Sequence, residues 1–298
     1  MSWDCFAWFA VSASVFWICG AVVSLRARRR LAPAVLTGCG SVIFVAFIVG
    51  VWITLGRPPL RTMGETRLWF SLFLSLVGLG VYLRWGYRWA LPFAGLMSVV
   101  FVCVNIFKPE IHSEALMPAL RSPWFVPHVI VYMFAYAVMG VATILAIRLL
   151  WLSSRSVRRM PRQIRTLGMP QGPESVQGVK DVRRTDCQGG AVPEDVRLCD
   201  TLVRIGWGFL TMGIVMGALW AKQAWGDYWT WDPKETWAAA TWLSYLLYLH
   251  LRQGKSLSDL RSLRLSLVLL VFSFLLLQMC WWGVNYLPSA QGFSLHTY

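Results

Sequence analysis

Eight apolar runs recur along this chain, each close to the length that crosses a lipid bilayer. A helix needs about 20 predominantly apolar residues to span a hydrocarbon core of ~30 Å. The runs lie at 5–24, 33–55, 68–83, 89–106, 128–151, 201–221, 237–251 and 265–284. The third and seventh are short and end in interfacial tryptophan and tyrosine, so seven spans is the alternative count. The sequence therefore predicts an all-α, polytopic integral membrane protein with about eight transmembrane helices.

The composition agrees with this prediction. Only 14% of the residues are charged, whereas soluble domains average about 25%. The first run has no basic residue before it and no small-residue cleavage site after it, and Arg26, Arg28, Arg29 and Arg30 follow it directly. We therefore expect the first run to be a retained helix and not a signal peptide.

The net charge of +14 is distributed unevenly over the loops. With eight spans, the loops 25–32, 84–88, 148–204 and 252–264 share one side, and they hold 21 Lys and Arg against 7 Asp and Glu. The rest of the chain holds 7 of each. The whole surplus thus lies on one side, as the positive-inside rule requires of a cytoplasmic face. This topology excludes a nucleic-acid partner and predicts both termini on the outer, periplasmic side.

The segment 152–200 is rich in Arg, Gly, Pro, Gln and Ser and has almost no apolar periodicity. It predicts a mobile, basic cytoplasmic loop. This loop divides a five-span half, 1–151, which ends with the His128 helix, from a three-span half, 201–298. The seven cysteines include no C-x-x-C pair; five lie in apolar runs as small hydrophobes, and Cys187 and Cys199 fall in the predicted loop.

The densest motif is WGDYWTWDPKETW at 225–237, which belongs to the three-span half. Its tryptophans are Trp225, Trp229, Trp231 and Trp237. They fit either an interfacial aromatic belt or a platform on which a large planar ligand stacks. Asp232 as N-cap, Pro233 at the first helical position and Glu235 as the capping-box residue predict a helix start. The positive end of that helix favours a ligand with anionic groups.

Two histidines bracket this motif on the predicted outer side. His128 lies at the outer end of the fifth run and His296 lies near the C-terminus. A planar anionic ligand between two neutral imidazoles suggests haem, although either histidine alone is also consistent with a surface residue. His112, in the same outer loop as His128, has no orienting partner and is predicted to be dispensable. His250 lies inside the seventh run and is predicted to be an inner haem ligand, or else an interfacial histidine.

These motifs together resemble a known family. The segment 225–237, followed by ATWLSYLLYLHLR, closely resembles the tryptophan-rich "WWD" signature of haem-handling cytochrome c assembly proteins, in particular the CcsA/ResC branch of system II cytochrome c synthases. PALRS at 118–122, ahead of His128 and Val129, and LHTY at 295–298 are similar to two further family segments. The loop 56–67 departs from the family's pattern at Thr62 and Gly64, so the resemblance assigns no role to it.

The resemblance implies a mechanism. Haem b passes from the cytoplasmic side to an outer site, where His128 and His296 hold the iron and the tryptophan segment, with Asp232, presents the vinyl groups. A reduced CxxCH apocytochrome c then docks, and its two thiols add across the vinyls. The chain is expected to act within a cytochrome c synthase (haem lyase) complex, beside a CcsB/ResB-type companion subunit. A bis-histidine inner site at His250 would need its second histidine from that subunit, because no other histidine of this chain lies inside a predicted span.

The expected location is the bacterial inner membrane, with the thylakoid membrane as the alternative. Two other functions stay open at this point. One is a haem exporter or relay of the system I type, which binds haem without forming the thioether. The other is a non-haem membrane transporter whose tryptophans are merely interfacial.

Overall fold

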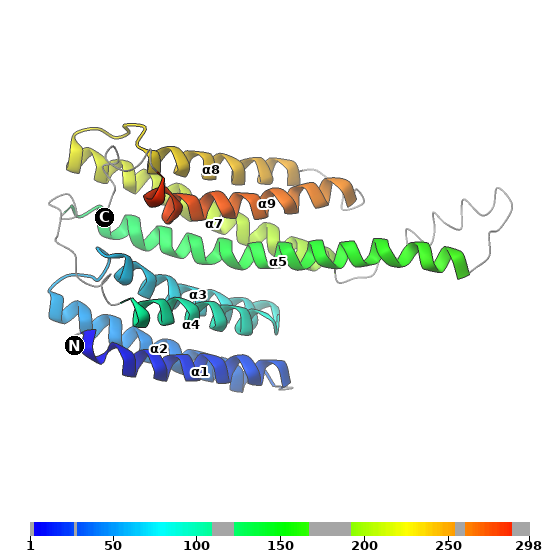
Figure 1. Cartoon of the computed structure of the whole chain (residues 1–298), viewed down its shortest axis with the longest axis horizontal. Coiled ribbons are helices and arrows are strands. Elements are labelled where there is room, and N and C mark those ends of the chain that lie inside the picture. Colours follow the sequence, from blue (N-terminus) through cyan, green and yellow to red (C-terminus); the bar gives the residue numbers. More distant parts are fainter. Residues whose placement is uncertain (1–2, 27–28, 109–121, 167–191, 254–259, 288–298) are drawn as a thin grey trace.

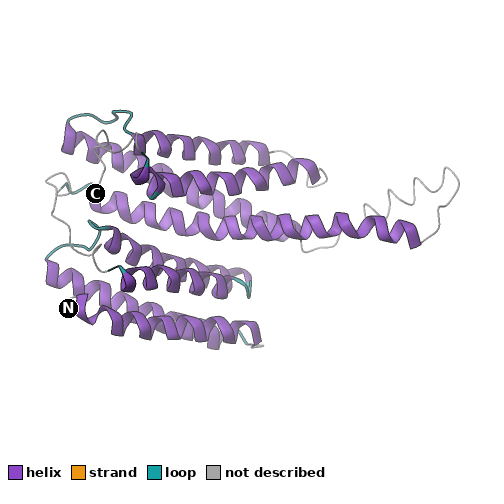
Figure 2. Ribbon diagram, viewed as in Figure 1, coloured by secondary structure: helices purple, strands orange, loops and turns teal. Residues whose placement is uncertain are grey.

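The structure is a computed structural model of the whole chain, and it describes residues 3–26, 29–108, 122–166, 192–253 and 260–287. The α-helices are α1 (Phe6–Arg26), α2 (Leu31–Leu55), α3 (Met63–Trp85), α4 (Ala90–Phe107), α5 (Phe125–Thr166), α7 (Val192–Trp225), α8 (Pro233–Arg252) and α9 (Leu260–Trp281), with short 3₁₀ turns η1 (Trp3–Cys5) and η4 (Gly283–Tyr286). The described ranges contain no strand (Figure 2). The all-α prediction is confirmed.

Among the described residues, seven helices are long and apolar enough to cross a membrane. The exception is α8, a helix of 20 residues that packs beside α9 and occupies the predicted seventh span. The protein is therefore a polytopic integral membrane protein. The helices run alternately up and down the bundle (Figure 1), so the first and last described residues lie at one end. Which side of the membrane this end faces stays a prediction.

The two ends of the bundle differ in character. The end that carries the 226–232 loop is called here the tryptophan end, and the opposite end, where α3 finishes and α7 begins, is called the arginine end. At the arginine end, Asp195 of α7 pairs with Arg148 (2.6 Å) and accepts a hydrogen bond from the Tyr87 hydroxyl. Asp200 pairs in the same way with Arg252 (3.0 Å). These contacts tie α5, α7 and α8 together there.

The central helix of the bundle is α5. It packs against α3, α7 and α9, and in Figure 1 it separates α1–α4 from α7–α9. Of its most apolar stretch, 72% is buried, against 50% or less for the other six candidate spans. Its first turn, which carries His128, is consequently held from several sides.

Both α5 and α7 extend into the segment that the sequence predicted as a loop. α5 continues to Thr166 and α7 begins at Val192, while residues 167–191 lie outside the described residues. The placement of Cys199 in a loop was wrong, because this side chain is buried inside α7. The charged residues beside it obscured the apolar face of the helix: Asp195 and Asp200 are neutralised by arginines of other helices, an arrangement that local periodicity does not reveal.

Candidate functional site

A capping box fixes the start of α8, as the sequence predicted. The Asp232 carboxylate accepts a hydrogen bond from the Lys234 amide (2.9 Å). The Glu235 carboxylate accepts from the amides of Thr230 (2.7 Å) and Asp232 (3.2 Å), and Pro233 occupies the first turn. Four amides are left without helical partners at a helix start, and the two carboxylates satisfy several of them. Capping is therefore a confirmed role of this acidic pair.

A second capping box starts α3, directly after the 57–62 loop. The Thr62 hydroxyl accepts from the Glu65 amide (3.1 Å), and the buried Glu65 carboxylate accepts from the amides of Arg61 (2.6 Å) and Thr62 (3.3 Å). Arg57 makes two parallel 3.0 Å hydrogen bonds to the same carboxylate. The loop also places Leu60 in a small apolar cluster with Phe125 and Trp220. The sequence assigned this loop no role, but the structure places it at the site.

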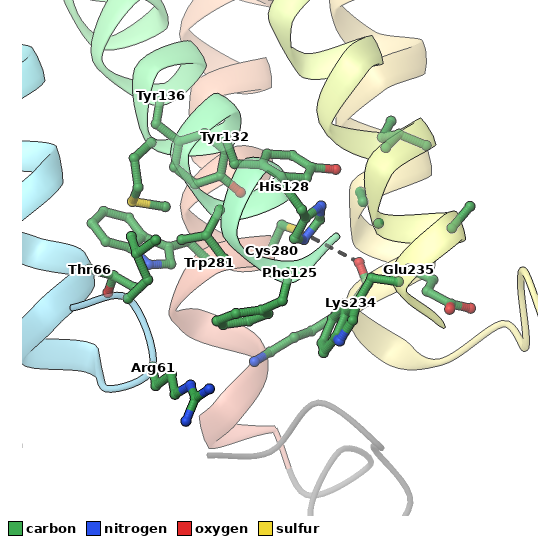
Figure 3. A pocket seen from close by; sticks show the side chains of 18 of the residues that line it. Arg61, Thr66, Phe125, His128, Tyr132, Tyr136, Lys234, Glu235, Cys280 and Trp281 are labelled. Atoms are coloured by element: carbon green, nitrogen blue, oxygen red, sulfur yellow. Dashed lines mark hydrogen bonds between the residues drawn. The ribbon is translucent and has the colours of Figure 1, made fainter. Parts of the chain in front are cut away.

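A cavity of about 160 Å³ lies between the two capped loops (Figure 3). The cavity wall is formed by α3, α5, α7, α8 and α9, and by the loops that precede α3 and α8. Its polar and aromatic lining includes Arg61, Phe125, His128, Tyr132, Tyr136, Trp220, Tyr228, Trp229, Lys234, Glu235, Cys280 and Trp281. Sites for whole drug-sized ligands measure roughly 300–1,000 Å³. At about 160 Å³ the cavity is smaller than such sites.

His128 is held firmly in the first turns of α5. Its Nδ1 lies 2.8 Å from the Gly213 carbonyl oxygen, which only accepts hydrogen bonds, so in the neutral ring Nδ1 carries the proton and Nε2 the lone pair. The ring packs against Tyr132 (4.7 Å between centroids) and Trp220 (5.7 Å). A Cβ atom on Gly217 would lie 2.7 Å from its Cε1. Glycine at 217 thus makes room for the imidazole.

The four predicted tryptophans occupy different surroundings. Trp229 lines the cavity, and its ring meets that of Trp231 at 5.8 Å. Trp231 is 73% exposed and has a φ of 58°, a left-handed conformation that side chains other than glycine rarely adopt. Trp225 ends α7 and packs on Trp220 at 4.8 Å, and Trp237 lies inside α8 away from the lining. Of these four tryptophans, Trp229 is therefore the one that lines the cavity together with His128.

His250 lies far from this cavity, near the arginine end of α8. Seventeen residues of helix separate it from Pro233, about 26 Å at 1.5 Å per residue. Its Nδ1 is 2.9 Å from the Leu246 carbonyl oxygen, and with Leu243 and Leu247 it forms an exposed stripe on α8. His112 and His296 lie outside the described residues.

Several cavity residues were not predicted from the sequence. Tyr132 and Tyr136 follow His128 by four and eight residues, the spacing of one helix face, so a signal for them existed. Trp220 lies five residues ahead of the tryptophan motif, and Arg61 belongs to a loop without a recognisable pattern. Lys234 lies in the motif itself, at a point where the sequence predicts only a helix start.

Lys234 and Cys280 meet at the base of the cavity. The Cys280 thiol donates to the Lys234 carbonyl oxygen at 3.6 Å. Lys234 lies in the first turn of α8, ahead of the predicted span 237–251. Burial lowers the pKa of its ammonium to about 8, against the opposing influence of Cys280 and Asp232. A cation thus contributes to a wall that is otherwise largely aromatic.

Fold and site together define a polytopic helical membrane protein with an oriented imidazole in an aromatic, partly cationic cavity. A family model described as "Cytochrome C assembly protein" matches residues 7–290, and the chain belongs to this family. Membership implies haem handling.

Curated relatives agree over most of the chain. The CcsA cytochrome c biogenesis protein of Trachelium caeruleum is 29% identical, covering 95% of this chain and 93% of its own length. A CcsA protein of Prochlorococcus marinus is 30% identical, over 89% of this chain and 83% of that protein. Another, from Prochlorococcus marinus strain MIT 9312, is 37% identical over 68% and 62%.

A solved structure, the cytochrome c haem lyase CcmF, shares the fold with a TM-score of 0.58 at 18% identity. The match covers 93% of this chain but only 48% of the solved chain, so our chain spans about half the length of that protein. At this identity the likeness concerns the fold alone.

Proposed function

We propose that this chain binds haem b at the tryptophan end with His128 as an iron ligand, and presents it for thioether attachment to a CxxCH apocytochrome c. The observation that carries the proposal is the His128 imidazole, whose Nδ1–H is directed at the Gly213 carbonyl. Iron-ligating histidines usually donate their second ring N–H to such an acceptor, which fixes the ring and raises the basicity of the ligating nitrogen. The second predicted ligand is His296.

The surroundings of His128 suit a planar ring. Tyr132, Trp220 and Trp229 supply aromatic walls, and Gly217 allows the imidazole to lie against α7. In this proposal one edge of the ring stays outside the cavity, where a docked protein can reach it. In thioether formation the thiol S–H adds across the vinyl C=C, so that a C–S and a C–H bond form without a net redox change.

His250 supports a second, inner haem contact. Its Nδ1 is also directed at a carbonyl, of Leu246, which leaves Nε2 as the basic nitrogen on the exposed stripe of α8. A second iron ligand facing this stripe would come from another chain. The companion subunit of the CcsB/ResB type is the proposed source, and this contact is the proposed entry route for haem.

The assignment of His128 as an iron ligand is tested by substituting two glycines of α7. In purified full-length protein, Gly217→Ala should displace the imidazole and lower the haem content or shift the Soret band, as His128→Ala should. Gly208→Ala is the matched control, because a Cβ there meets nothing within 4 Å. Added imidazole should partly restore the His128→Ala spectrum. Equal, unaltered spectra in Gly217→Ala, His128→Ala and wild type would overturn the assignment.

Thioether formation is tested separately by co-expression with a CxxCH reporter and the companion subunit, followed by staining for covalent haem. We expect covalent product with wild type, little with His128→Ala, and a loss with His250→Ala that is greatest when haem is limiting. Bound haem without covalent product would favour a haem exporter or relay instead. Absence of any haem spectrum would favour a transporter with interfacial tryptophans.

A further inference from the structure

We propose that Arg61 and Lys234 form a paired carboxylate-binding site that selects a porphyrin carrying two carboxylates and fixes which edge of the ring faces outward. The inference rests on the proposed haem binding and deepens it. It concerns one residue at each of the two capped helix starts, and the sequence singled out neither as a ligand-binding residue.

Both cations belong to the cavity wall. Arg61 immediately precedes the N-cap of α3, and Lys234 lies in the first turn of α8. In the view of Figure 3 the two side chains extend to the same side of Phe125, and His128 lies on the other side. The cavity thus has an imidazole in one part and two cations in another, the arrangement expected for a ligand with a metal at its centre and anions at one edge.

The backbone holds both cations in place. The Arg61 amide donates to the Glu65 carboxylate at 2.6 Å, and the Lys234 amide donates to the Asp232 carboxylate at 2.9 Å. The Lys234 carbonyl oxygen is contacted by the Cys280 thiol. Each cation is therefore presented by a rigid helix start, which lowers the conformational entropy lost when it engages an anion.

Each described carboxylate near these cations accepts a hydrogen bond from a backbone amide. Asp232, which also interacts electrostatically with the Lys234 ammonium, accepts one from the Lys234 amide. Glu65 accepts the Arg57 guanidinium and two amides. Glu235, the one acidic residue of the described cavity wall, accepts from the amides of Thr230 and Asp232. The positive ends of α3 and α8 add partial positive charge. The wall is thus suited to an anionic ligand.

The ligand chemistry follows from the pairing. A guanidinium and an ammonium bind carboxylates through charge-assisted hydrogen bonds, and two such groups at two helix starts match two carboxylates better than one. Haem carries two propionates on one edge and its vinyl groups elsewhere on the ring. Anchoring the propionates therefore fixes the position of the vinyls, and that orientation is what attachment to two thiols requires.

The test compares haem b with its monomethyl and dimethyl esters, which remove one or both negative charges and keep the ring. Affinities are measured by Soret titration of full-length protein at fixed salt. In wild type we expect the diacid to bind most tightly and the diester most weakly, with about tenfold lost per carboxylate, as for a charged hydrogen bond. Equal wild-type affinities for diacid and diester would overturn the inference.

Arg61→Met and Lys234→Met remove each charge while keeping an apolar chain. Each should weaken binding of the diacid about tenfold and leave that of the diester unchanged, and the double variant should bind the three ligands alike. Lys234→Arg and Arg61→Lys should retain most of the preference. Lys108→Met is the matched control: Lys108 is exposed at the same end of the bundle and lies outside the cavity wall, so its variant should keep the wild-type preference.

If both Met variants lose diacid and diester equally, the side chains serve packing and the inference fails while haem binding stands. If wild type binds none of the three ligands, the proposed function itself fails. The two failures are therefore distinguishable.

Discussion

The loops 57–62 and 226–232 flank the same cavity and end in the same device, a capping box whose glutamate collects backbone amides, yet they differ in how they are stabilised. The 57–62 loop is largely buried: Leu60 is 1% exposed, and Arg57 makes two hydrogen bonds to the Glu65 carboxylate. The 226–232 loop is more exposed: Tyr228 and Trp231 are largely accessible, and Trp231 has a strained backbone conformation. We infer that the first loop mainly holds the shape of the site, with Arg61 as its contact to the ligand, and that the second meets the ligand through its aromatic side chains.

The largest expected effect is a loss of stability when the 57–62 loop is disrupted at Glu65. Glu65→Ala removes the partner of Arg57 and leaves several amides without an acceptor. Breaking a buried pair in this way costs about 3–5 kcal/mol, whereas Glu235→Ala removes an acceptor without an ion pair and should cost about 1–3 kcal/mol. Thermal unfolding of the detergent-solubilised protein would measure both.

Glu65→Gln keeps an acceptor and should fall between wild type and Glu65→Ala. A double-mutant cycle with Arg57→Met isolates the ion pair from the amide contacts. If Glu65→Ala proves less destabilising than Glu235→Ala, the 226–232 loop, and not the 57–62 loop, is the main stabilising loop.

Substitutions in the 226–232 loop should affect ligand binding more than stability. Trp229→Ala removes a cavity-lining ring and should weaken haem binding by about 1 kcal/mol beyond the lost buried area, while Trp229→Phe retains part of this. Trp231→Ala is the comparison within the same loop and should weaken it less, because Trp231 touches the site through Trp229. Soret titration distinguishes them. Wild-type affinity in both Ala variants would support a plain interfacial belt.

The sequence predicted the main features of the 226–232 loop but not those of the 57–62 loop, and the reason is physical. A capping box within four residues and a row of tryptophans are local patterns, so the start of α8 at Pro233 was predicted correctly, as was the position of His128 at the end of a span. The Arg57–Glu65 pair spans eight residues, and Asp195 and Asp200 pair with residues 47 and 52 positions away. Such contacts depend on how helices pack, and local patterns do not encode them.

The two N-caps provide a smaller, matched comparison. Asp232→Asn keeps the side-chain acceptor and should be milder than Asp232→Ala, which loses about 1 kcal/mol of capping. Thr62→Ser and Thr62→Ala form the corresponding pair on α3. Unfolding free energies would show whether both caps follow the same order. Asp232→Asn as damaging as Asp232→Ala would show that the charge matters beyond capping.

The smallest predicted effect concerns pH and separates Lys234 from Arg61. Asp232, two residues earlier in the chain, and Cys280 on α9 interact electrostatically with the Lys234 ammonium. The other charged or titratable residues of the described cavity wall are Arg61, His128, Tyr132, Tyr136, Tyr228 and Glu235. Burial lowers the pKa of this ammonium from 10.5 to about 8, so it loses its charge as pH rises through that value, whereas a guanidinium stays charged.

If the charged form binds the propionate, haem affinity should fall about threefold between about pH 7 and pH 8.5, because the charged fraction falls about fourfold and the uncharged form binds about tenfold more weakly. Lys234→Arg should abolish this fall, and the dimethyl ester, which offers no carboxylate, should show none in wild type. Comparing the diacid with the diester removes the pH dependence of the iron itself, since both share it. An identical pH profile in wild type and Lys234→Arg would show that Lys234 does not contact the ligand, leaving Arg61 as the sole cation of the pair.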